Sequence, residues 1–298
     1  MRRLLIFAAL LAAFAFAAAC SDDGDGGGVP EIDAAALTPV RGNSEVVVGP
    51  NRFSLGLLDA NNQPFVPDEG TSLRLRFLYI NDLIFEHETT FVYAIPGESG
   101  FFVANVTFPS GGDQWSVEPV LTTSDQTATI AELQLDVLEE SQVPNIGGQA
   151  ISVENLTASS EPNMKRLTTD ENPNLAFYQK TVAQALQGAR PLVIVFATPA
   201  FCQTAFCGPI LDNVKAVQPE FADEVDFIHI EPYELDADGG LVVTGANNAP
   251  VVTAPMQAWK LQTEPWVYVV DGQGLITARF EGAAAPEELR EAIQAAAG

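Results

Sequence analysis

The chain has 298 residues, 47% of them hydrophobic, which is long enough for two domains and too apolar for a disordered protein. It contains 14 Lys and Arg residues and 39 Asp and Glu residues, which give a formal net charge of −25. Such an acidic chain is repelled by phosphate backbones and anionic lipid headgroups. This excludes nucleic acid as a partner, and any membrane attachment must come from acyl chains.

The first twenty residues predict export. Arg2 and Arg3 precede an apolar run, residues 4–19, that is shorter than the roughly 20 residues of a membrane-spanning helix. A charged start, a short apolar run and small residues are typical of a secretory signal peptide. The small residues leading into Cys20 resemble the bacterial lipoprotein box, although Ala17 stands where Leu is usual. The resemblance implies a signal peptide over residues 1–19 and a lipidated Cys20 outside the cytoplasmic membrane, with cleavage without lipidation as the alternative.

Residues 20–42 begin with SDDGDGGG, which predicts a flexible acidic tether. Between residues 43 and 140, short runs alternate apolar and polar positions, as in SLRLRF, and turn sequences such as PGESG separate them. About seven strands without a helical stripe predict an antiparallel β-sandwich of immunoglobulin-like type. Six of these runs cover residues 52–59, 72–80, 89–95, 101–108, 114–121 and 128–138.

Residues 141–173 are rich in Pro, Gly, Asn, Ser and Thr and are expected to form a linker, with a short strand around 151–153. In residues 174–298 helical and strand patterns alternate, which predicts an α/β domain with a mixed sheet. Helices are expected over 175–187, from Gly208 onward, within 253–262 and over 286–297. Strands are expected over 192–197, 225–231, 265–271 and 275–282.

Cys202 and Cys207 follow the apolar run LVIVFA with four residues between them. On a continuous helix such residues lie about 7.5 Å apart along the axis and about 140° apart around it, too far for a disulfide. A bond between them therefore requires a non-helical segment. Pro199 and the Gly208–Pro209 pair place Cys202 on a loop and Cys207 at a helix N-terminus, where the helix dipole favours a thiolate.

The order of elements over residues 165–298 resembles the thioredoxin fold. The cysteine motif follows the first buried strand, Glu264–Pro265 stands where thioredoxin-like proteins have a cis-proline, and Asp271-Gly-Gln-Gly turns the hairpin. The resemblance implies thiol–disulfide exchange, with the Cys202–Cys207 disulfide as the redox-active group and no metal or other cofactor. Cys202 would attack and Cys207 would resolve, an order that the helix position of Cys207 leaves open.

The same resemblance implies the substrate contacts. Pro265 would present backbone groups to an extended partner segment, with Glu264 in front of the sulfurs and with Phe201 and Trp266 as an apolar rim. Two departures from the family are evident: the run LVIVFATPAF carries no acidic residue, and Glu264 replaces the usual Thr. The expected partners are exported proteins with thiols or disulfides, and the chain is expected to be a monomer.

Two alternatives remain open. A disulfide is a common staple in oxidising compartments, so the protein could be a non-catalytic binding or scaffold lipoprotein. Sco-type copper-handling proteins have a similar cysteine pair and a distal histidine, and two thiolates can hold Cu(I). His229 does not occupy the position of that ligand and is expected to be a core histidine, while His87 is expected at a solvated strand end and Met256 in the core.

Overall fold

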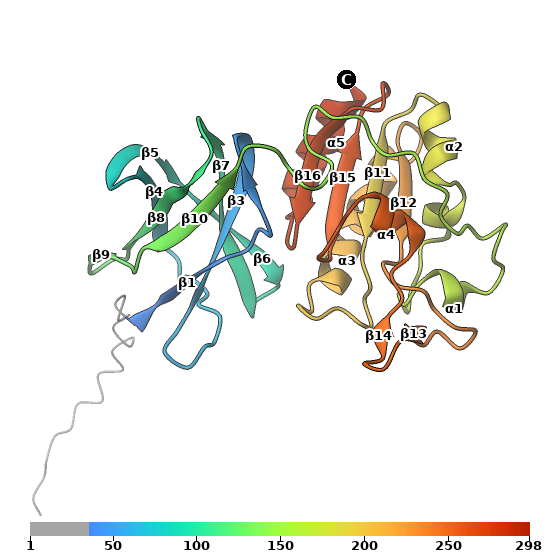
Figure 1. Cartoon of the computed structure of the whole chain (residues 1–298), viewed down its shortest axis with the longest axis horizontal. Coiled ribbons are helices and arrows are strands. Elements are labelled where there is room, and N and C mark those ends of the chain that lie inside the picture. The colour runs from blue at the N-terminus through green and yellow to red at the C-terminus, as the bar shows by residue number, and fades with distance from the viewer. Residues whose placement is uncertain (1–35) are drawn as a thin grey trace, which may run out of the picture. The chain divides into compact units, whose positions relative to one another are not determined.

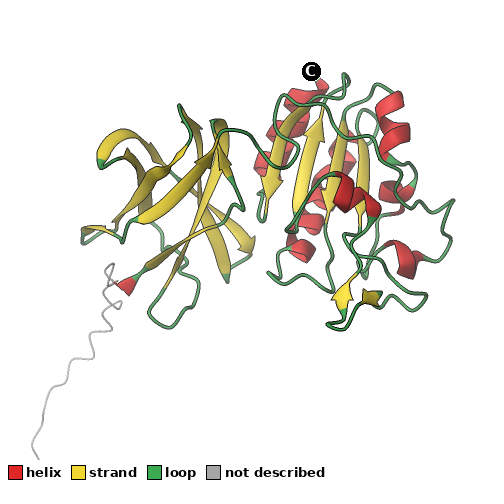
Figure 2. Cartoon of the chain, viewed as in Figure 1, coloured by secondary structure: helices red, strands yellow, loops and turns green. Residues whose placement is uncertain are grey.

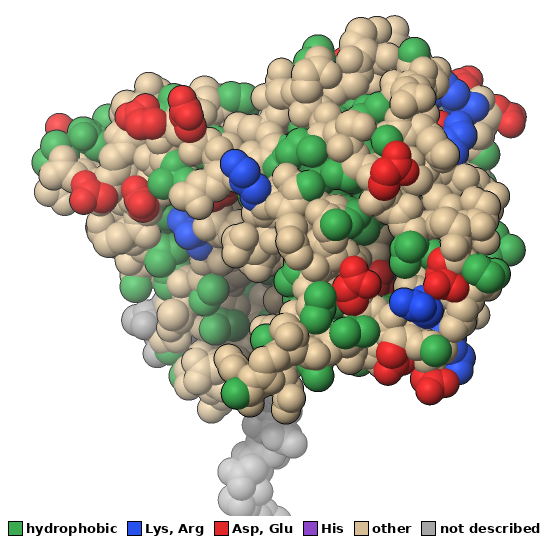
Figure 3. All heavy atoms as spheres, turned by 45° about the vertical axis from the view of Figure 1, so that its right-hand side comes forward, with side chains coloured by type: hydrophobic (Ala, Val, Ile, Leu, Met, Phe, Trp, Pro, Cys, Tyr) green, Lys and Arg blue, Asp and Glu red, His purple; other side chains and the backbone are tan. Residues whose placement is uncertain are grey.

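The structure is a computed structural model that describes residues 36–298, all of them within one compact unit, Ala34–Gly298. The predicted signal peptide, Cys20 and most of the tether lie outside the described residues. None of the helices in the described part is long and apolar enough to cross a membrane. On the face that Figure 3 shows, acidic and basic side chains are dispersed rather than gathered in one patch.

The N-terminal region is all-β, as Figure 2 shows, and its strands form two sheets. One sheet has the order β1-β3-β7-β6, and the other has the order β2-β10-β8-β4-β5 with β9 paired to β8. All of these pairs are antiparallel except β2 with β10. The strands are β1 Thr38–Arg41, β2 Val46–Val47, β3 Gly49–Leu58, β4 Ser72–Tyr79, β5 Asp82–Glu88, β6 Thr90–Ile95, β7 Ser99–Phe108, β8 Gly112–Thr122, β9 Thr127–Thr129 and β10 Leu133–Leu138.

Aromatic side chains from both sheets form the core of this region. Phe77 of β4 packs edge to face on Phe53 of β3, at 5.2 Å between ring centroids, and on Phe108 of β7, at 5.4 Å. Trp115 is buried, and its indole N–H donates to the Ser110 carbonyl at 3.1 Å. The apolar alternation predicted most strands correctly. It missed three strands: β1, which pairs with β3 and occupies the end of the segment predicted to be a flexible tether; the two-residue β2; and β5. β5 is an edge strand whose residues are nearly all exposed and therefore show no period-two pattern.

The C-terminal region has a mixed sheet in the order β12-β11-β15-β16 (Figure 1). The central strand β11 is parallel to β12 and antiparallel to β15, and all five of its residues are buried. Both faces of the sheet are covered, one by α3 and α5 and the other by α2 and α4. The strands are β11 Leu192–Phe196, β12 Asp226–Ile230, β13 Val243–Thr244, β14 Ala249–Pro250, β15 Trp266–Val270 and β16 Ile276–Glu281, and the helices are α1 Met164–Leu167, α2 Val182–Gln187, α3 Cys207–Phe221, α4 Ala254–Ala258 and α5 Pro286–Ala297.

The helix expected over residues 175–187 is two shorter elements, a 3-10 helix at Leu175–Tyr178 and α2. Thr181 starts α2 with a capping box. Its hydroxyl accepts the N–H of Gln184 at 3.1 Å, and the Gln184 side chain accepts the N–H of Thr181 at 3.0 Å. A strong cap inside an apparently continuous helical pattern breaks that pattern in two.

Residues 141–173, expected to form a linker, lie against the C-terminal region. The Trp259 indole N–H donates to the Ile151 carbonyl at 3.1 Å, and Leu167 of α1 is buried in the core beside α3. The strand expected around residues 151–153 does not form. The segment is an ordered arm of the α/β region rather than a free connection.

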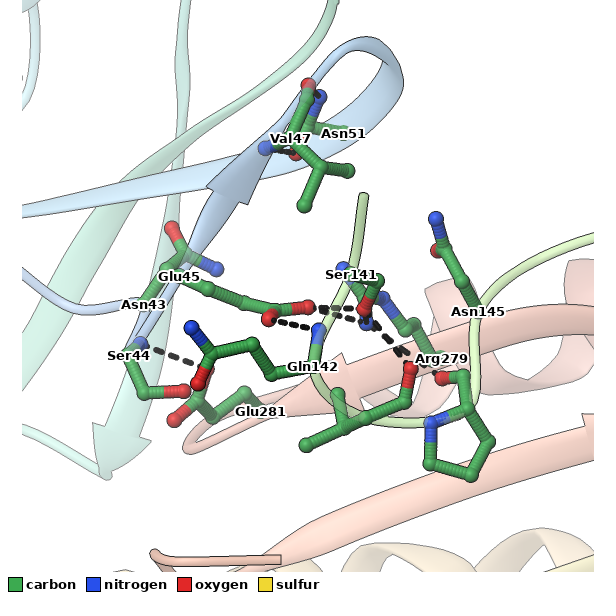
Figure 4. A network of polar contacts seen from close by, with 12 residues as sticks. Asn43, Ser44, Glu45, Val47, Asn51, Ser141, Gln142, Asn145, Arg279 and Glu281 are labelled. Carbon is green, nitrogen blue, oxygen red and sulfur yellow. Dashed lines mark hydrogen bonds and ion pairs between the residues drawn. The ribbon is translucent and has the colours of Figure 1, made fainter. Parts of the chain in front are cut away.

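Polar contacts join the all-β region to β16 (Figure 4). Arg279 Nη1 lies 2.9 Å from Glu45 Oε1, with side chains only 11% and 8% exposed, and Ser141 donates its hydroxyl to the same carboxylate. The Ser44 N–H donates to Glu281 Oε2 at 2.8 Å. The two regions are therefore held together by a buried ion pair and by hydrogen bonds.

Candidate redox site

A disulfide joins Cys202 to Cys207 at the carboxyl end of β11. The Cα atoms are 5.9 Å apart, within the range for such a bond. The segment between the cysteines is a turn rather than a helix, and Ala205 adopts a left-handed conformation at φ +61°. Helix α3 begins at Cys207, so the predicted helix start and the predicted non-helical loop are both confirmed.

The two sulfurs have different surroundings. Cys207 is fully buried, whereas Cys202 is half-buried and packs at the edge of the same core. The Sγ of Cys202 accepts the backbone N–H of Cys207 at 3.3 Å and lies 3.4 Å from the Thr204 hydroxyl. Phe206 precedes the helix and provides no side-chain cap, so this sulfur takes that place. A thiolate at Cys202 would be stabilised by the helix N-terminus.

The Glu264–Pro265 peptide bond is cis and lies at the same sheet edge as the cysteine loop. In the antiparallel pair of β11 and β15, Phe196 stands opposite Trp266, so the residues before Trp266 lie beside those after Phe196. Glu264 is half-buried and accepts the Tyr233 hydroxyl at 3.0 Å. Burial raises the pKa of Glu264, and the bond from Tyr233 opposes that rise.

The apolar rim expected from Trp266 is wrong, because this side chain is only 2% exposed. Its ring stacks on Tyr268, and its indole N–H donates to the Thr263 hydroxyl at 3.0 Å. Strand alternation sends Trp266 into the core face away from α3. Phe201 is half-buried in the loop before Cys202, where the sequence placed it.

A buried acidic residue comes from the neighbouring strand. Phe196 of β11 pairs with Ile230 of β12, so Glu231 lies beside the start of the cysteine loop. Its carboxylate accepts the Thr169 N–H at 3.0 Å and the Thr169 hydroxyl at 3.2 Å, and that hydroxyl also accepts the Ala200 N–H at 3.1 Å. Burial raises the pKa of Glu231 to about 7, and the bonds from Thr169 oppose this rise.

The sequence contained a signal for this residue, since Glu231 ends the predicted buried strand VDFIHIE. Alternation places it on the same face of the sheet as Phe227, which shares a core with Cys207. The strand before the cysteine motif, β11, carries no acidic residue, but the adjacent strand β12 is followed by one, Glu231, at the same end of the sheet. Only the parallel pairing of β11 with β12 makes it a neighbour of the cysteine loop.

His229 is a core residue, as expected. Its Nε2 lies 2.9 Å from the Ala197 carbonyl, which can only accept, so Nε2 carries the proton and Nδ1 accepts the Tyr178 hydroxyl at 2.7 Å. Burial lowers the pKa of His229 to about 4, so the ring is neutral at pH 7. Both nitrogens are engaged, and His229 cannot serve as the distal ligand of a Sco-type copper site.

Other expectations about single residues also agree with the structure. Met256 is buried in the core, and His87 lies exposed near the end of β5. Over residues 36–298 no group of three or more His, Cys, Asp and Glu side chains is placed to hold a metal ion.

No protein-family model matches the chain, and no curated protein matches it. Among solved structures it is similar to a thiol:disulfide interchange protein of the thioredoxin family from Chlorobium tepidum TLS. The similarity covers 53% of this chain and 99% of that one, at 14% identity and a TM-score of 0.33.

Proposed function

We propose that this protein exchanges disulfides with partner proteins through Cys202 and Cys207. The observation that carries the proposal is the position of the pair: a half-buried sulfur accepts the first N–H of α3, and the sulfur bonded to it is fully buried. An accessible thiol at a helix N-terminus is stabilised as a thiolate, the form that attacks a disulfide.

In the reducing direction, the Cys202 thiolate attacks one sulfur of a partner disulfide. A mixed disulfide forms, the partner bond breaks, and the second partner sulfur leaves as a thiolate that takes up a proton. The Cys207 thiolate then attacks Cys202 Sγ, and the first partner sulfur leaves. The partner disulfide has become a dithiol, and the Cys202–Cys207 dithiol has become a disulfide. The reverse sequence oxidises a partner dithiol, and the relative reduction potentials set the direction.

We further propose that the chain works outside the cytoplasmic membrane as a monomer, attached through a lipid on Cys20. The order of charged residues, apolar run and small residues before that cysteine supports export and lipid attachment. The all-β region is proposed to be immunoglobulin-like, on the strength of its two packed sheets and its strand-turn sequence pattern.

The test is the reduction potential of the Cys202–Cys207 bond in the purified protein, measured against glutathione or dithiothreitol. A value between about −270 and −120 mV supports exchange. A value below about −300 mV is that of a structural disulfide and would contradict the proposal in favour of a binding or scaffold protein.

A second measurement assigns the roles of the two cysteines. The reduced Cys207→Ser variant should accumulate a mixed disulfide with a peptide disulfide, because no resolving thiol is left. The reduced Cys202→Ser variant, with its remaining thiol buried, should accumulate far less. Equal trapping by the two variants would contradict the assignment of Cys202 as the attacking thiol.

A further inference from the structure

A groove with a volume of about 420 Å³ opens beside the cysteine loop. Thr204, Phe206 and Glu264 line it from the C-terminal region, and Gly42 and Phe101 line it from the all-β region. Thr204 lines the groove and also contacts the disulfide, since its hydroxyl lies 3.4 Å from Cys202 Sγ. A partner bonded through sulfur to Cys202 therefore has this groove immediately beside it.

Phe101 of β7 shapes the wall that the all-β region provides. Its ring lies 2.7 Å from the point that a Cβ on Gly42 would occupy and 3.6 Å from the corresponding point on Gly56. The ring also packs edge to face on Phe206, the residue before α3, at 5.6 Å between centroids. A side chain at Gly42 would displace the ring, whereas a Cβ at Gly56 would only contact it. The packing of Phe101 on Phe206 joins this wall to the cysteine loop.

This wall is fixed relative to the cysteine loop. Phe101 and Phe206 pack against a small apolar cluster that joins β6 and β7 to the segment between β16 and α5, with buried members Val92, Ala94, Val103 and Ala283. The Arg52 guanidinium also forms a two-pronged ion pair with Glu288 of α5, at 2.8 and 2.9 Å. The all-β region is thus joined to the C-terminal region by an apolar cluster and a bidentate ion pair as well as by the covalent chain.

The groove combines an apolar lining with two carboxyls, Glu264 and Glu281, and one guanidinium, Arg41, so its charged groups are acidic in balance. Glu264 accepts a hydrogen bond from Tyr233, but none of the ion pairs formed within residues 36–298 includes it. A half-buried carboxylate without a cation favours a basic group in whatever fills the groove. Phe101, Phe206 and Val40 offer apolar surface for a bulky side chain.

We propose that this groove binds an extended segment of a protein substrate in which the reacting cysteine is flanked by a bulky apolar residue and a basic residue. The inference rests on the proposed exchange function and adds its substrate class. In an extended chain a side chain two positions from the cysteine lies about 7 Å along the strand. That reach takes an apolar side chain from a sulfur bonded to Cys202 past Thr204, which contacts Cys202 Sγ and lines the groove. The all-β region then provides the larger part of the lining of this substrate-binding groove.

The test uses the reduced full chain and two substrates. One is dithiobis(nitrobenzoate), a small disulfide. The other is a short peptide with the order Leu-Ser-Cys-Ser-Lys, its cysteine held as a mixed disulfide with thionitrobenzoate. Attack of Cys202 on the peptide sulfur forms the Cys202–peptide disulfide and releases coloured thionitrobenzoate, and Cys207 then releases the peptide thiol.

Two variants change the lining of the groove without replacing the cysteines or Glu264. Val40→Trp adds bulk at a position that is 41% exposed and lines the groove, and Phe101→Ala removes the ring. Leu83→Trp is the matched control, because Leu83 is 46% exposed on β5, which contributes nothing to the groove. We expect both groove variants to lose about tenfold in kcat/KM for the peptide and to keep the wild-type rate with the small disulfide.

The outcomes separate the two proposals. If Val40→Trp and Phe101→Ala exchange with the small disulfide and also keep the wild-type rate with the peptide, the groove does not bind substrate. The proposed exchange function would then still stand. A wild-type protein that exchanges with neither substrate would overturn the exchange function and the groove with it.

A peptide with Ser for Leu and Glu for Lys should react with the wild-type protein as slowly as the original peptide reacts with the variants. Equal wild-type rates for the two peptides would also overturn the groove.

Discussion

Cys207 donates its backbone N–H to the Sγ of Cys202 at 3.3 Å, so the sulfur of the first cysteine caps the helix that the second cysteine begins. A helix start without a side-chain cap leaves N–H groups available, and here one of them points at the more accessible sulfur. The sequence suggested that the helix dipole favours Cys207. The geometry instead directs the first N–H to Cys202 and buries Cys207 completely.

This relationship predicts the order in which the reduced cysteines react. We expect iodoacetamide to modify Cys202 at least about ten times faster than Cys207 at pH 7, because thiolate character and access both favour it. Mass spectrometry of peptides after short exposure measures the ratio. In urea both thiols should react at similar rates, which is the control. Faster modification of Cys207 in the folded protein would contradict the proposed roles.

Much of the region around the disulfide could be predicted from local patterns. The continuous apolar run gave β11, Gly208–Pro209 located the start of α3, and the segment between the cysteines had to be non-helical for them to bond. These features depend on neighbours in the chain, which is why spacing and turn chemistry sufficed to predict them.

The rest of the site depends on segments that are far apart in the sequence. Glu231 becomes relevant only when β12 pairs with β11, and Phe101 only when the all-β region packs on Phe206. Trp266 failed as a rim residue because the alternation of β15 sends its side chain inward. The pairing of β12 with β11 and the packing of Phe101 on Phe206 leave no mark on local composition or spacing, although the place of Glu231 at the end of a predicted buried strand was visible in the sequence.

Glu231 predicts a specific dependence of stability on pH. Its pKa is about 7 in the folded protein, whereas the ordinary value is 4.5. Between pH 4.5 and about pH 7 the folded chain therefore holds a proton that the unfolded chain has released. The free energy of unfolding should therefore fall as the pH rises from about 4.5 to about 7 and become level above that, by about 3 kcal/mol for this group. Urea denaturation at several pH values measures it.

The control is Glu231→Gln, which keeps an oxygen for Thr169 and cannot ionise. Because other buried carboxyls contribute to the wild-type curve, the quantity of interest is the difference between the two proteins. The variant should gain stability relative to the wild type as the pH rises through that window. A difference that does not vary with pH would show that Glu231 titrates at its ordinary pKa.

Tyr233 predicts a change in the pKa of Glu264. Its hydroxyl donates to Glu264 Oε2 at 3.0 Å and stabilises the carboxylate, in opposition to burial. Tyr233→Phe should therefore raise the pKa of Glu264 further above its ordinary value, as followed by NMR titration of the side-chain carboxyl carbon. Tyr93→Phe, at a 43% exposed position on β6, is the control. An unchanged or lowered pKa in Tyr233→Phe would contradict the hydrogen bond.

The ion pair between Arg279 and Glu45 predicts how strongly the two regions are joined. Both side chains are about one-tenth exposed, so removing one partner leaves a buried charge uncompensated. Arg279→Met should lower the free energy of unfolding by about 3–5 kcal/mol in urea denaturation at pH 7, whereas the double variant Arg279→Met with Glu45→Leu should recover most of the loss.

Arg74→Met is the matched control, because its ion pair with Glu88 is exposed and contributes little. Equal effects of Arg279→Met and Arg74→Met would mean that the contact between the regions opens in solution. In that case the wall formed by Phe101 would not stay beside the cysteine loop, and Arg279→Met would leave peptide exchange unchanged. If the contact is closed, Arg279→Met should also slow exchange with the apolar peptide while sparing the small disulfide, since loosening β16 displaces the groove but not the Cys202–Cys207 pair.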